Sequence, residues 1–354
     1  MKLLAASVAA GLSVAVASLV ITAPARADLP IAPPAFPVEG YAWGWQPNNP
    51  GYVANSGYEY NSAGGAVTIT RPGTGVYQVR FAGMAAAGGV AHVSAYGSNS
   101  ICVVSSWIQS GGDELVNVRC FSPAGAAADS RFIAHVTNRT DGIARGFAWS
   151  SDPTPPLGGY VPSAQYSFDS TGQQIMVFPE GVGAYAVELN AFGQDIGGLW
   201  TTGVLRVTAY GAAAVTCQAL DPALFTDPAV LRVRCFDTTG HSVNSRFALS
   251  YTRGVVPNSA TVSNYALVPS VVGSSGPAPS VTALDSDGDY QVTFPGAAAA
   301  GGHAFASIMG TPPMYCNIHS WVALLGSQIL RVRCYQPGGG QLNPGMLVNV
   351  GFVV

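Results

Sequence analysis

The chain has 354 residues, of which 48% are hydrophobic and only 9% are charged, and its formal net charge is −3. A weakly acidic chain without a block of basic residues argues against nucleic acid or anionic lipid as a partner. The 43 glycines and 25 prolines occur throughout the sequence, which favours short elements joined by turns over long helices.

The first 27 residues have the pattern of a secretory signal peptide. Lys2 supplies the positive start, residues 3–21 form an apolar run, and residues 25–27, Ala-Arg-Ala, have the form of a cleavage site. A membrane anchor is the alternative, but the run is rich in small residues and no later stretch is long enough to span a bilayer. We therefore expect a secreted protein whose mature chain has 13 basic and 18 acidic residues, a charge of −5.

The remainder of the chain predicts an all-β protein made of three copies of one unit. Short runs of alternating apolar and polar residues are separated by turn residues, and no long stretch has helical periodicity. After a linker over residues 28–39, the copies (repeats 1, 2 and 3) span residues 40–138, 145–252 and 264–354. Each has roughly the length of an antiparallel immunoglobulin-like or jelly-roll-like β-sandwich. The short polar or proline-bearing joints predict three separate domains in a semi-rigid row.

Each copy starts with an aromatic segment, which is followed by a turn. Residues 40–43, Gly-Tyr-Ala-Trp, open repeat 1, residues 146–149, Gly-Phe-Ala-Trp, open repeat 2, and residues 265–267, Tyr-Ala-Leu, are the weaker form in repeat 3. The turns begin with Asn or Asp and reach Gly three positions later, which is ordinary turn chemistry. They lie at residues 61–64, 169–172 and 285–288.

Two strands are expected between this turn and the first cysteine of each copy. In repeat 1, Tyr77, Val79 and Phe81 share one face of the first of these strands because side chains alternate with period two. The second runs over residues 90–96 and ends at a glycine. Residues with this alternation are core positions, and the same pattern returns at Tyr185, Val187 and Leu189 and at Tyr290, Val292 and Phe294.

The six cysteines form three pairs, each separated by 18 positions. The pairs are Cys102 with Cys120, Cys217 with Cys235, and Cys316 with Cys334. If each pair lies across an antiparallel hairpin, the two cysteines are opposite each other and close enough to form a disulfide, which stabilises the fold by roughly 3 kcal/mol. The same register pairs Trp107 with Leu115 and places it on the face opposite the disulfide.

The tryptophans are the best candidates for ligand binding, because a rigid β-face of aromatic and Arg side chains suits a sugar ring or a protein partner. In the register above, Trp107 and Trp321 lie beside Arg119 and Arg333. The alternative is that a second sheet covers this face and that Arg stacks on Trp for structural reasons. The candidate residues are Trp43, Trp45, Trp107, Trp149, Trp321, Arg119 and Arg333.

Residues 285–289, Asp-Ser-Asp-Gly-Asp, are the most site-like string in the chain. Asp285, Asp287 and Asp289 are weak candidates for Ca²⁺ ligands, since acids on alternating positions can present oxygens to this ion. Gly falls at position four rather than six and no Glu follows at position twelve, so a turn is the alternative. We expect no other metal site, because no pair of histidines or cysteines has zinc spacing.

No catalytic signature is present: the sequence has no G-x-S-x-G motif, and disulfides account for every cysteine. A glycosidase would need two opposed carboxylates, and such a pair assembled between domains stays open. We expect no cofactor and no catalytic residue.

The repeated motifs resemble the repeat of secreted, largely uncharacterised proteins of high-GC bacteria, and the resemblance covers nearly the whole mature chain. It implies no activity. The motifs are residues 40–43, 75–81, 95–97, 118–121 and 129–132.

Together these features predict a secreted, non-catalytic β-repeat protein that binds a polysaccharide or a protein at the cell surface or in the extracellular matrix. The alternatives are a secreted hydrolase with a site between domains and a purely structural component of the cell envelope.

Overall fold

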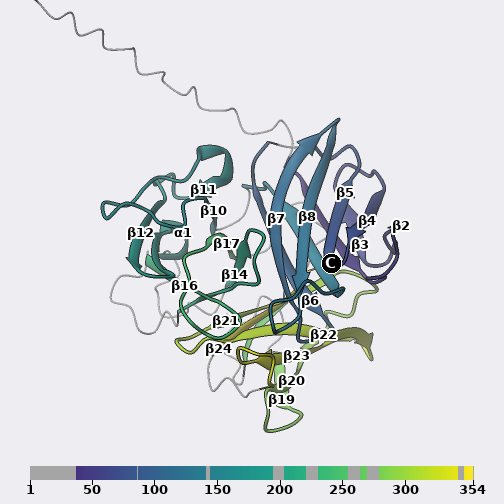
Figure 1. The fold of residues 1–354 in the computed structure, drawn as a ribbon. Helices are drawn as coiled ribbons and strands as arrows, with labels where there is room; N and C mark the ends of the chain where they lie inside the picture. Colours follow the sequence, from purple (N-terminus) through teal and green to yellow (C-terminus); the bar gives the residue numbers. More distant parts are fainter. Residues whose placement is uncertain are drawn as a thin grey trace, which may run out of the picture. The chain divides into compact units, whose positions relative to one another are not determined.

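The computed structural model describes residues 37–85, 87–140, 144–193, 203–220, 230–253, 264–268, 279–341 and 347–353. Over these residues the chain is nearly all β, with one short α-helix, α1 (Asn190–Gly193), and one 3-10 helix, η1 (Ala164–Tyr166) (Figure 1). This confirms the predicted fold class. The signal peptide predicted for residues 1–27 lies outside the described residues. None of the described helices has the length and apolarity needed to cross a membrane.

Each repeat contributes a series of strands. Repeat 1 contains β1 (Glu39–Gly44), β2 (Gly51–Val53), β3 (Glu59–Asn61), β4 (Val67–Gly73), β5 (Val76–Phe81), β6 (Val90–Tyr96), β7 (Ile101–Ser110), β8 (Asp113–Phe121) and β9 (Arg131–Thr137). Repeat 2 contains β10 (Ala144–Ser150), β11 (Ser167–Asp169), β12 (Met176–Gly181), β13 (Ala184–Glu188), β14 (Gly203–Tyr210), β15 (Thr216–Ala219), β16 (Val230–Phe236) and β17 (Arg246–Arg253). Repeat 3 contains β18 (Asn264–Val268), β19 (Ser280–Ala283), β20 (Asp289–Pro295), β21 (His303–Met309), β22 (Tyr315–Leu324), β23 (Ser327–Tyr335) and β24 (Leu347–Val353).

Every sheet is shared between two repeats. The strand orders are β19-β20-β23-β22-β6-β9-β1-β3, β11-β10-β17-β14-β7-β8-β5-β4-β2 and β12-β13-β16-β15-β21-β24-β18. Repeat 3 thus shares a sheet with repeat 1, repeat 2 with repeat 1, and repeat 2 with repeat 3. The expectation of three separate domains in a row is therefore wrong.

The three joints between repeats have the same geometry. Strands within each repeat pair antiparallel, whereas each joint is a single parallel bridge between two residues. The bridged pairs are Tyr96 with Ile318, Tyr210 with Val104, and Met309 with Ala219. In each joint the N–H of the glycine that follows the strand donates to the neighbouring repeat over 2.9 Å, from Gly97 to Ile318, Gly211 to Val104, and Gly310 to Ala219. Gly97 and Gly211 have φ angles of 71° and 147°, which favour glycine over residues that carry a Cβ.

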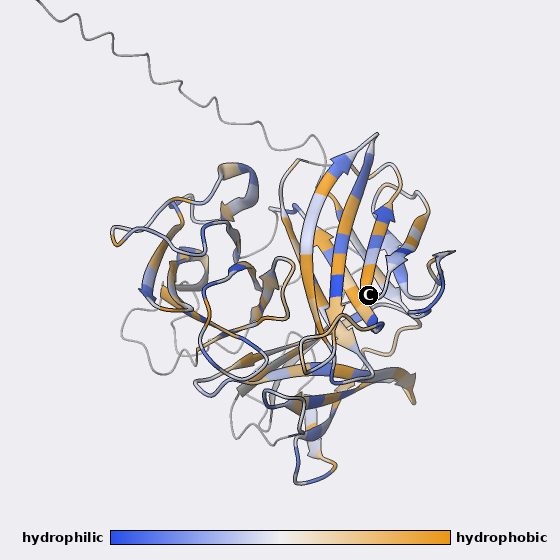
Figure 2. Cartoon of the chain, in the orientation of Figure 1, coloured by the Kyte–Doolittle hydropathy of each residue, from blue (hydrophilic) through white to orange (hydrophobic). Residues whose placement is uncertain are grey.

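The predicted inward positions form the core. Tyr77, Val79 and Phe81 are at most 1% exposed, and so are their counterparts in repeats 2 and 3. The hydropathy colours alternate along β8, as expected for a strand with one buried face, whereas β7 begins with four consecutive buried apolar residues (Figure 2). The core of repeat 1 also includes Phe147 and Ala248 of repeat 2, because the shared sheet brings them onto it.

The three predicted disulfides are present. They join Cys102 to Cys120, Cys217 to Cys235 and Cys316 to Cys334, across strand pairs of the cysteine hairpins. Five of the six cysteines are fully buried, and Cys217 is half-buried. The inner face of each hairpin is therefore the cysteine face. Three such bonds fit an oxidising compartment.

The predicted hairpin register is correct near the cysteines and wrong towards the turn. Val104 faces Val118 as expected, but a β-bulge after Val104 shifts the pairing, so that Trp107 faces Val116 instead of Leu115. The same bulge after Ile318 pairs Trp321 with Leu330. Because side chains alternate, one extra residue moves both tryptophans to the disulfide face.

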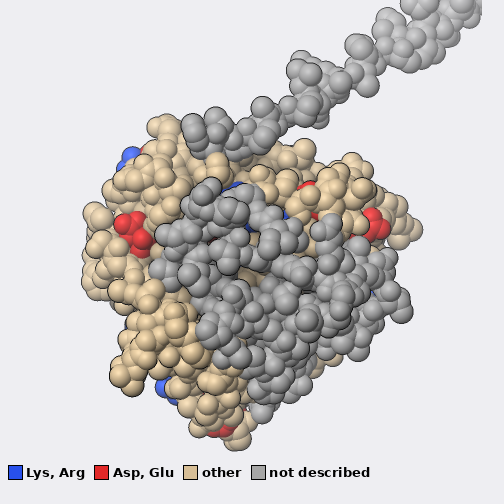
Figure 3. Space-filling view, turned by 180° about the vertical axis from the view of Figure 1, so that it is seen from behind, with Lys and Arg blue, Asp and Glu red and all other residues tan. Residues whose placement is uncertain are grey.

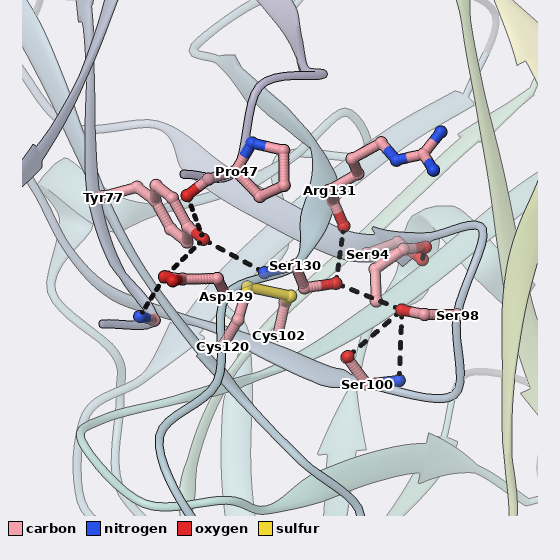
Figure 4. The surroundings of a disulfide bond; sticks show 12 residues. Pro47, Tyr77, Ser94, Ser98, Ser100, Cys102, Cys120, Asp129, Ser130 and Arg131 are labelled. Atoms are coloured by element: carbon pink, nitrogen blue, oxygen red, sulfur yellow. Dashed lines mark hydrogen bonds between the residues drawn. A yellow bond between two sulfur atoms is a disulfide. The ribbon is translucent and has the colours of Figure 1, made fainter. Parts of the chain in front are cut away.

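The repeated Ser-Arg-Phe motif has a structural role, which Figure 4 shows beside the first disulfide. The Tyr77 hydroxyl donates to the Pro47 carbonyl over 3.1 Å and accepts the N–H of Ser130 over 3.0 Å. In repeat 2, Tyr185 donates to the Pro153 carbonyl over 2.8 Å and accepts the N–H of Ser245 over 2.9 Å. The same two contacts in both copies satisfy the hydroxyl of a buried tyrosine, which needs hydrogen-bond partners.

Candidate functional site

Four aromatic rings cluster at the joint between repeats 1 and 2, and we call them the Trp107 cluster. Trp107 comes from β7, Trp149 from β10, Tyr166 from η1 and Tyr210 from β14. Five ring pairs have centroid separations between 5.1 and 5.7 Å, mostly in edge-to-face geometry. The bulge in β7 places Trp107 here, because it turns the side chain towards the neighbouring repeat's rings.

A hollow opens beside this cluster. It has a volume of about 140 Å³ and is lined by Trp107, Ile108, Trp149, Tyr166 and Tyr210. Trp107 is almost fully buried, the other three rings are half-buried, and Ile108 is 49% exposed, so a ligand reaches the hollow from solvent. Among the residues that the structure describes, no charged or amide side chain lines it.

A second cluster, the Trp43 cluster, occupies the matching place at the joint between repeats 1 and 3. Trp43, Tyr58, Tyr96 and Trp321 form the same five pairs, with centroid separations from 5.0 to 5.8 Å. Trp45 extends it, with its ring 6.3 Å from that of Trp43.

The joint between repeats 2 and 3 does not repeat these rings. In the strand register, Met309 takes the place of Tyr96 and Tyr210. In the sequence, Leu267 takes the place of Trp43 and Trp149. The same backbone hydrogen bond nevertheless closes this joint. The rings are therefore not needed to join two repeats.

The indole N–H groups of the two clusters have no conventional acceptor among the described residues. They belong to Trp43, Trp107, Trp149 and Trp321. Edge-to-face packing of aromatic rings is favourable in itself, because the positive edge of one ring meets the negative face of the next. The clusters thus hold the indoles in fixed orientations without using a polar side chain.

One buried polar position distinguishes the two clusters. Glu114, which is 2% exposed, pairs with Gln109 in the hairpin that carries Trp107. Burial raises the pKa of Tyr166 in the Trp107 cluster, and the carboxylate of Glu114 adds to the rise. In repeat 3 the matching residue, six positions before the second cysteine, is Gln328, which is fully buried.

The structure brings four of the five predicted tryptophans into the clusters and adds Trp45 at the edge of one, but it separates them from the predicted arginines. Arg119 pairs with Val103 on the face opposite the disulfide, whereas Trp107 lies on the disulfide face. Arg333 Nε donates to Asp289 over 2.7 Å. The tyrosines of both clusters were not predicted as site residues, although Tyr58 and Tyr166 recur at matching positions of two copies.

The three candidate Ca²⁺ ligands act in the fold. Asp289 is fully buried and accepts hydrogen bonds from Arg331 and Arg333. Burial acts to raise the pKa of Asp289, but the two guanidinium groups outweigh it and the pKa is lowered. Asp285 accepts the N–H groups of Asp287 and Asp289, as in a turn. The described residues contain no group of three or more His, Cys, Asp or Glu side chains arranged to hold a metal.

A second polar region, the buried polar centre, lies where strands of the three repeats meet. Arg206 Nη1 donates to His135 Nδ1 over 3.0 Å, and His135 Nε2 lies 3.1 Å from Glu39 Oε1. The Arg206 guanidinium also stacks over Phe305 at 3.9 Å, and His303 stacks on His135 at 4.9 Å. Each of these contacts except that of Glu39 with His135 joins different repeats.

Burial dominates the electrostatics of this centre. It lowers the pKa of His135 and of His303 well below the usual range, and the nearby Arg206 lowers both further. Burial also lowers the pKa of Arg206, which the carboxylate of Glu39 acts to raise. These histidines are therefore neutral in the folded protein at pH 7.

The sequence contains a signal for this centre that residue spacing alone does not reveal. His92, Arg206 and Phe305 occupy the same register position in the three repeats, as each is paired with the matching residue of the next strand. This core position carries an imidazole, a guanidinium and a phenyl ring in the three copies. Such a difference at one repeated position indicates that side chains from different copies contact each other.

Charged side chains form no concentrated patch on the surface seen in Figure 3, where those of the described residues are few and scattered. No protein-family model, no curated protein and no solved structure matches this chain. The resemblance to secreted bacterial repeats stays a prediction.

Proposed function

We propose that this is a secreted, non-catalytic binding protein that takes a ligand of the cell surface or extracellular matrix into the hollow of the Trp107 cluster. The observation that carries this proposal is a solvent-reached hollow with aromatic walls from two repeats, at a joint whose backbone bond does not need those rings. Concave sites with mostly apolar walls are typical of ligand binding. The signal-peptide pattern and the three disulfides support secretion.

The alternative of a hydrolase finds less support in the described residues. No carboxylate lines the hollow, and the buried polar centre uses one carboxylate, Glu39, as a hydrogen-bond acceptor for His135 and Arg139. A glycosidase needs two carboxyl groups on opposite sides of a substrate. Binding without catalysis is therefore the proposal that the geometry supports best.

The test is retention of the mature protein on insoluble polysaccharides and cell-wall preparations, followed by tryptophan fluorescence with any ligand that retains it. We expect retention and a change in emission. Tyr166→Leu should reduce both by removing one wall, and Val182→Ser, at an exposed position that does not line the hollow, should not. Absence of retention on every matrix would contradict the proposal and favour a structural component of the envelope.

A further inference from the structure

We infer that the group bound in the hollow of the Trp107 cluster is a quaternary ammonium, such as the trimethylammonium of a choline or betaine group. The inference rests on the proposed function and names the chemical class of its ligand. Three features of the hollow carry it: the directions of its ring planes, the lack of charged and amide side chains among its described lining residues, and the buried side chain of Glu114, which acts on Tyr166.

The ring planes around the hollow are tilted strongly against one another. The planes of Trp149, Tyr166 and Tyr210 make angles of 70°, 79° and 87° with the plane of Trp107. A flat sugar ring packs best on one exposed ring face, whereas a compact, nearly spherical cation contacts several faces at once. Ring faces carry partial negative charge, and groups of them recognise quaternary ammonium ions.

The size of the hollow agrees with this assignment. A cavity of about 150 Å³ is known to hold one benzene molecule. The hollow, at about 140 Å³, therefore takes one compact group of similar or smaller size. A trimethylammonium group meets this limit, while a hexose with its shell of hydroxyl groups would extend beyond the aromatic walls.

The polar chemistry of the walls excludes a ligand that needs many hydrogen bonds. The polar side-chain groups among the described lining residues are the phenol hydroxyls of Tyr166 and Tyr210 and the indole N–H groups of Trp107 and Trp149. A hydroxyl group of a ligand that is buried here without a partner loses its hydrogen bonds to water and gains none. A quaternary ammonium has neither an N–H donor nor a lone pair, so it enters such a site without losing a directed hydrogen bond.

The charges near the hollow are compatible with a cation. Glu114 is 2% exposed and acts on the phenol of Tyr166, so its carboxylate is poorly screened by solvent. Arg246 is paired with Tyr210 in the sheet, but its side chain is exposed, where water and salt weaken its repulsion. The chain itself uses this kind of contact in the Trp43 cluster, where the Arg131 guanidinium lies 5.9 Å from the centroid of Tyr96.

The experiment is a fluorescence titration of the mature protein with choline and with 3,3-dimethylbutanol, its uncharged counterpart of nearly the same shape. We expect choline to change the tryptophan emission with saturation and the neutral alcohol to bind roughly tenfold more weakly. Equal affinity for both would overturn the inference, because shape alone would then explain binding.

Two variants locate the effect. Glu114→Gln copies the residue of repeat 3 and should weaken choline binding several-fold while leaving the neutral alcohol unchanged. Tyr166→Leu should weaken choline binding, and its counterpart Tyr58→Leu in the Trp43 cluster should leave it intact. Unfolding curves show whether each variant is folded. Choline binding that survives both Glu114→Gln and Tyr166→Leu in folded protein would overturn the assignment to this hollow.

Vesicles separate the possible sources of the group. Binding to phosphatidylcholine vesicles, but not to phosphatidylethanolamine vesicles, and its competition by free choline, would assign a lipid headgroup. Binding of free choline without vesicle binding would assign a soluble or polymer-borne group. Retention on polysaccharide with no response to choline would overturn this inference and leave the proposed function standing, whereas the absence of both would overturn the two together.

Discussion

The joint between repeats 1 and 2 and the joint between repeats 2 and 3 have the same backbone and different side chains. Both contain one parallel bridge and one hydrogen bond of 2.9 Å from a glycine that follows a strand. Only the first carries the Trp107 cluster with its hollow, since Met309 and Leu267 replace two of the rings in the second. The bridge and its hydrogen bond are therefore common to both joints, while the aromatic rings are additional and call for a functional explanation.

The largest expected effect comes from removing the central ring of a cluster. Trp107→Ala should lower the free energy of unfolding by about 3–5 kcal/mol, because it deletes a large, nearly buried side chain that contacts three other rings. Trp321→Ala should have a similar effect in the Trp43 cluster. Urea unfolding measures both losses, and a loss below about 1 kcal/mol for either would show that the rings do not stabilise their joint.

Removing a disulfide should affect the two joints alike. The double substitution of Cys102 and Cys120 by Ala should lower the free energy of unfolding by about 3 kcal/mol, since the cross-link restricts the unfolded chain. The disulfide between Cys217 and Cys235 closes a loop of the same length, since both pairs have a sequence separation of 18. Its removal should therefore lower the free energy of unfolding by the same amount. Unequal losses in chemical denaturation would indicate that the aromatic cluster and the disulfide depend on each other.

Acid should destabilise the buried polar centre, to which all three repeats contribute side chains. His92, His135 and His303 have pKa values lowered by burial in the folded protein, so the unfolded chain binds more protons below its usual pKa of about 6.5. The stability is therefore complete above that value and falls as the pH decreases through and below it. Unfolding curves between pH 7.5 and 5 test this expectation.

A matched variant assigns the acid effect to a residue. His303→Val places at this position the residue that repeats 1 and 2 have in the same register, Val90 and Val204. It should reduce the loss of stability on acidification. An unchanged pH dependence would show that His303 binds protons equally in the folded and unfolded states, or that other groups dominate.

The smallest expected effect tests the glycine of a joint without touching its rings. Gly97 has a φ of 71°, and a Cβ there would meet no atom closer than 3.7 Å, so only backbone strain opposes Gly97→Ala. The cost should be about 1 kcal/mol. Gly73→Ala is the control, because that glycine has no atom within 4 Å of an added Cβ. Equal thermal midpoints for the two variants would contradict this account.

Several features of the fold followed from local patterns in the sequence. The spacing of 18 between paired cysteines predicted each disulfide, because an antiparallel hairpin of that length places the two cysteines opposite each other. The alternation at Tyr77, Val79 and Phe81 predicted buried positions, since strand side chains point to opposite faces. The tryptophans were singled out as a group, and four of them pack in two clusters, but the predicted face of Trp107 and Trp321 was wrong.

The physical reason for that error is the bulge in β7 and β22. One extra residue has no signature in the pattern of apolar side chains, yet it reverses the face of every residue beyond it. The register predicted for Trp107 and Trp321 therefore failed, while the register of the cysteines, on the other side of the bulge, was correct.

The sequence by itself determined the elements whose cause is local: the strands, the turns, the paired cysteines and the inward faces. The tertiary structure decided how the repeats combine, since the sheets are completed by strands more than a hundred residues apart, such as β7 and β14. It also determined which side chains meet in the Trp107 cluster and in the buried polar centre. The Trp107 cluster and the contact of Arg206 with His135 join side chains from different repeats, and a preference for such contacts is not encoded in any single stretch of the chain.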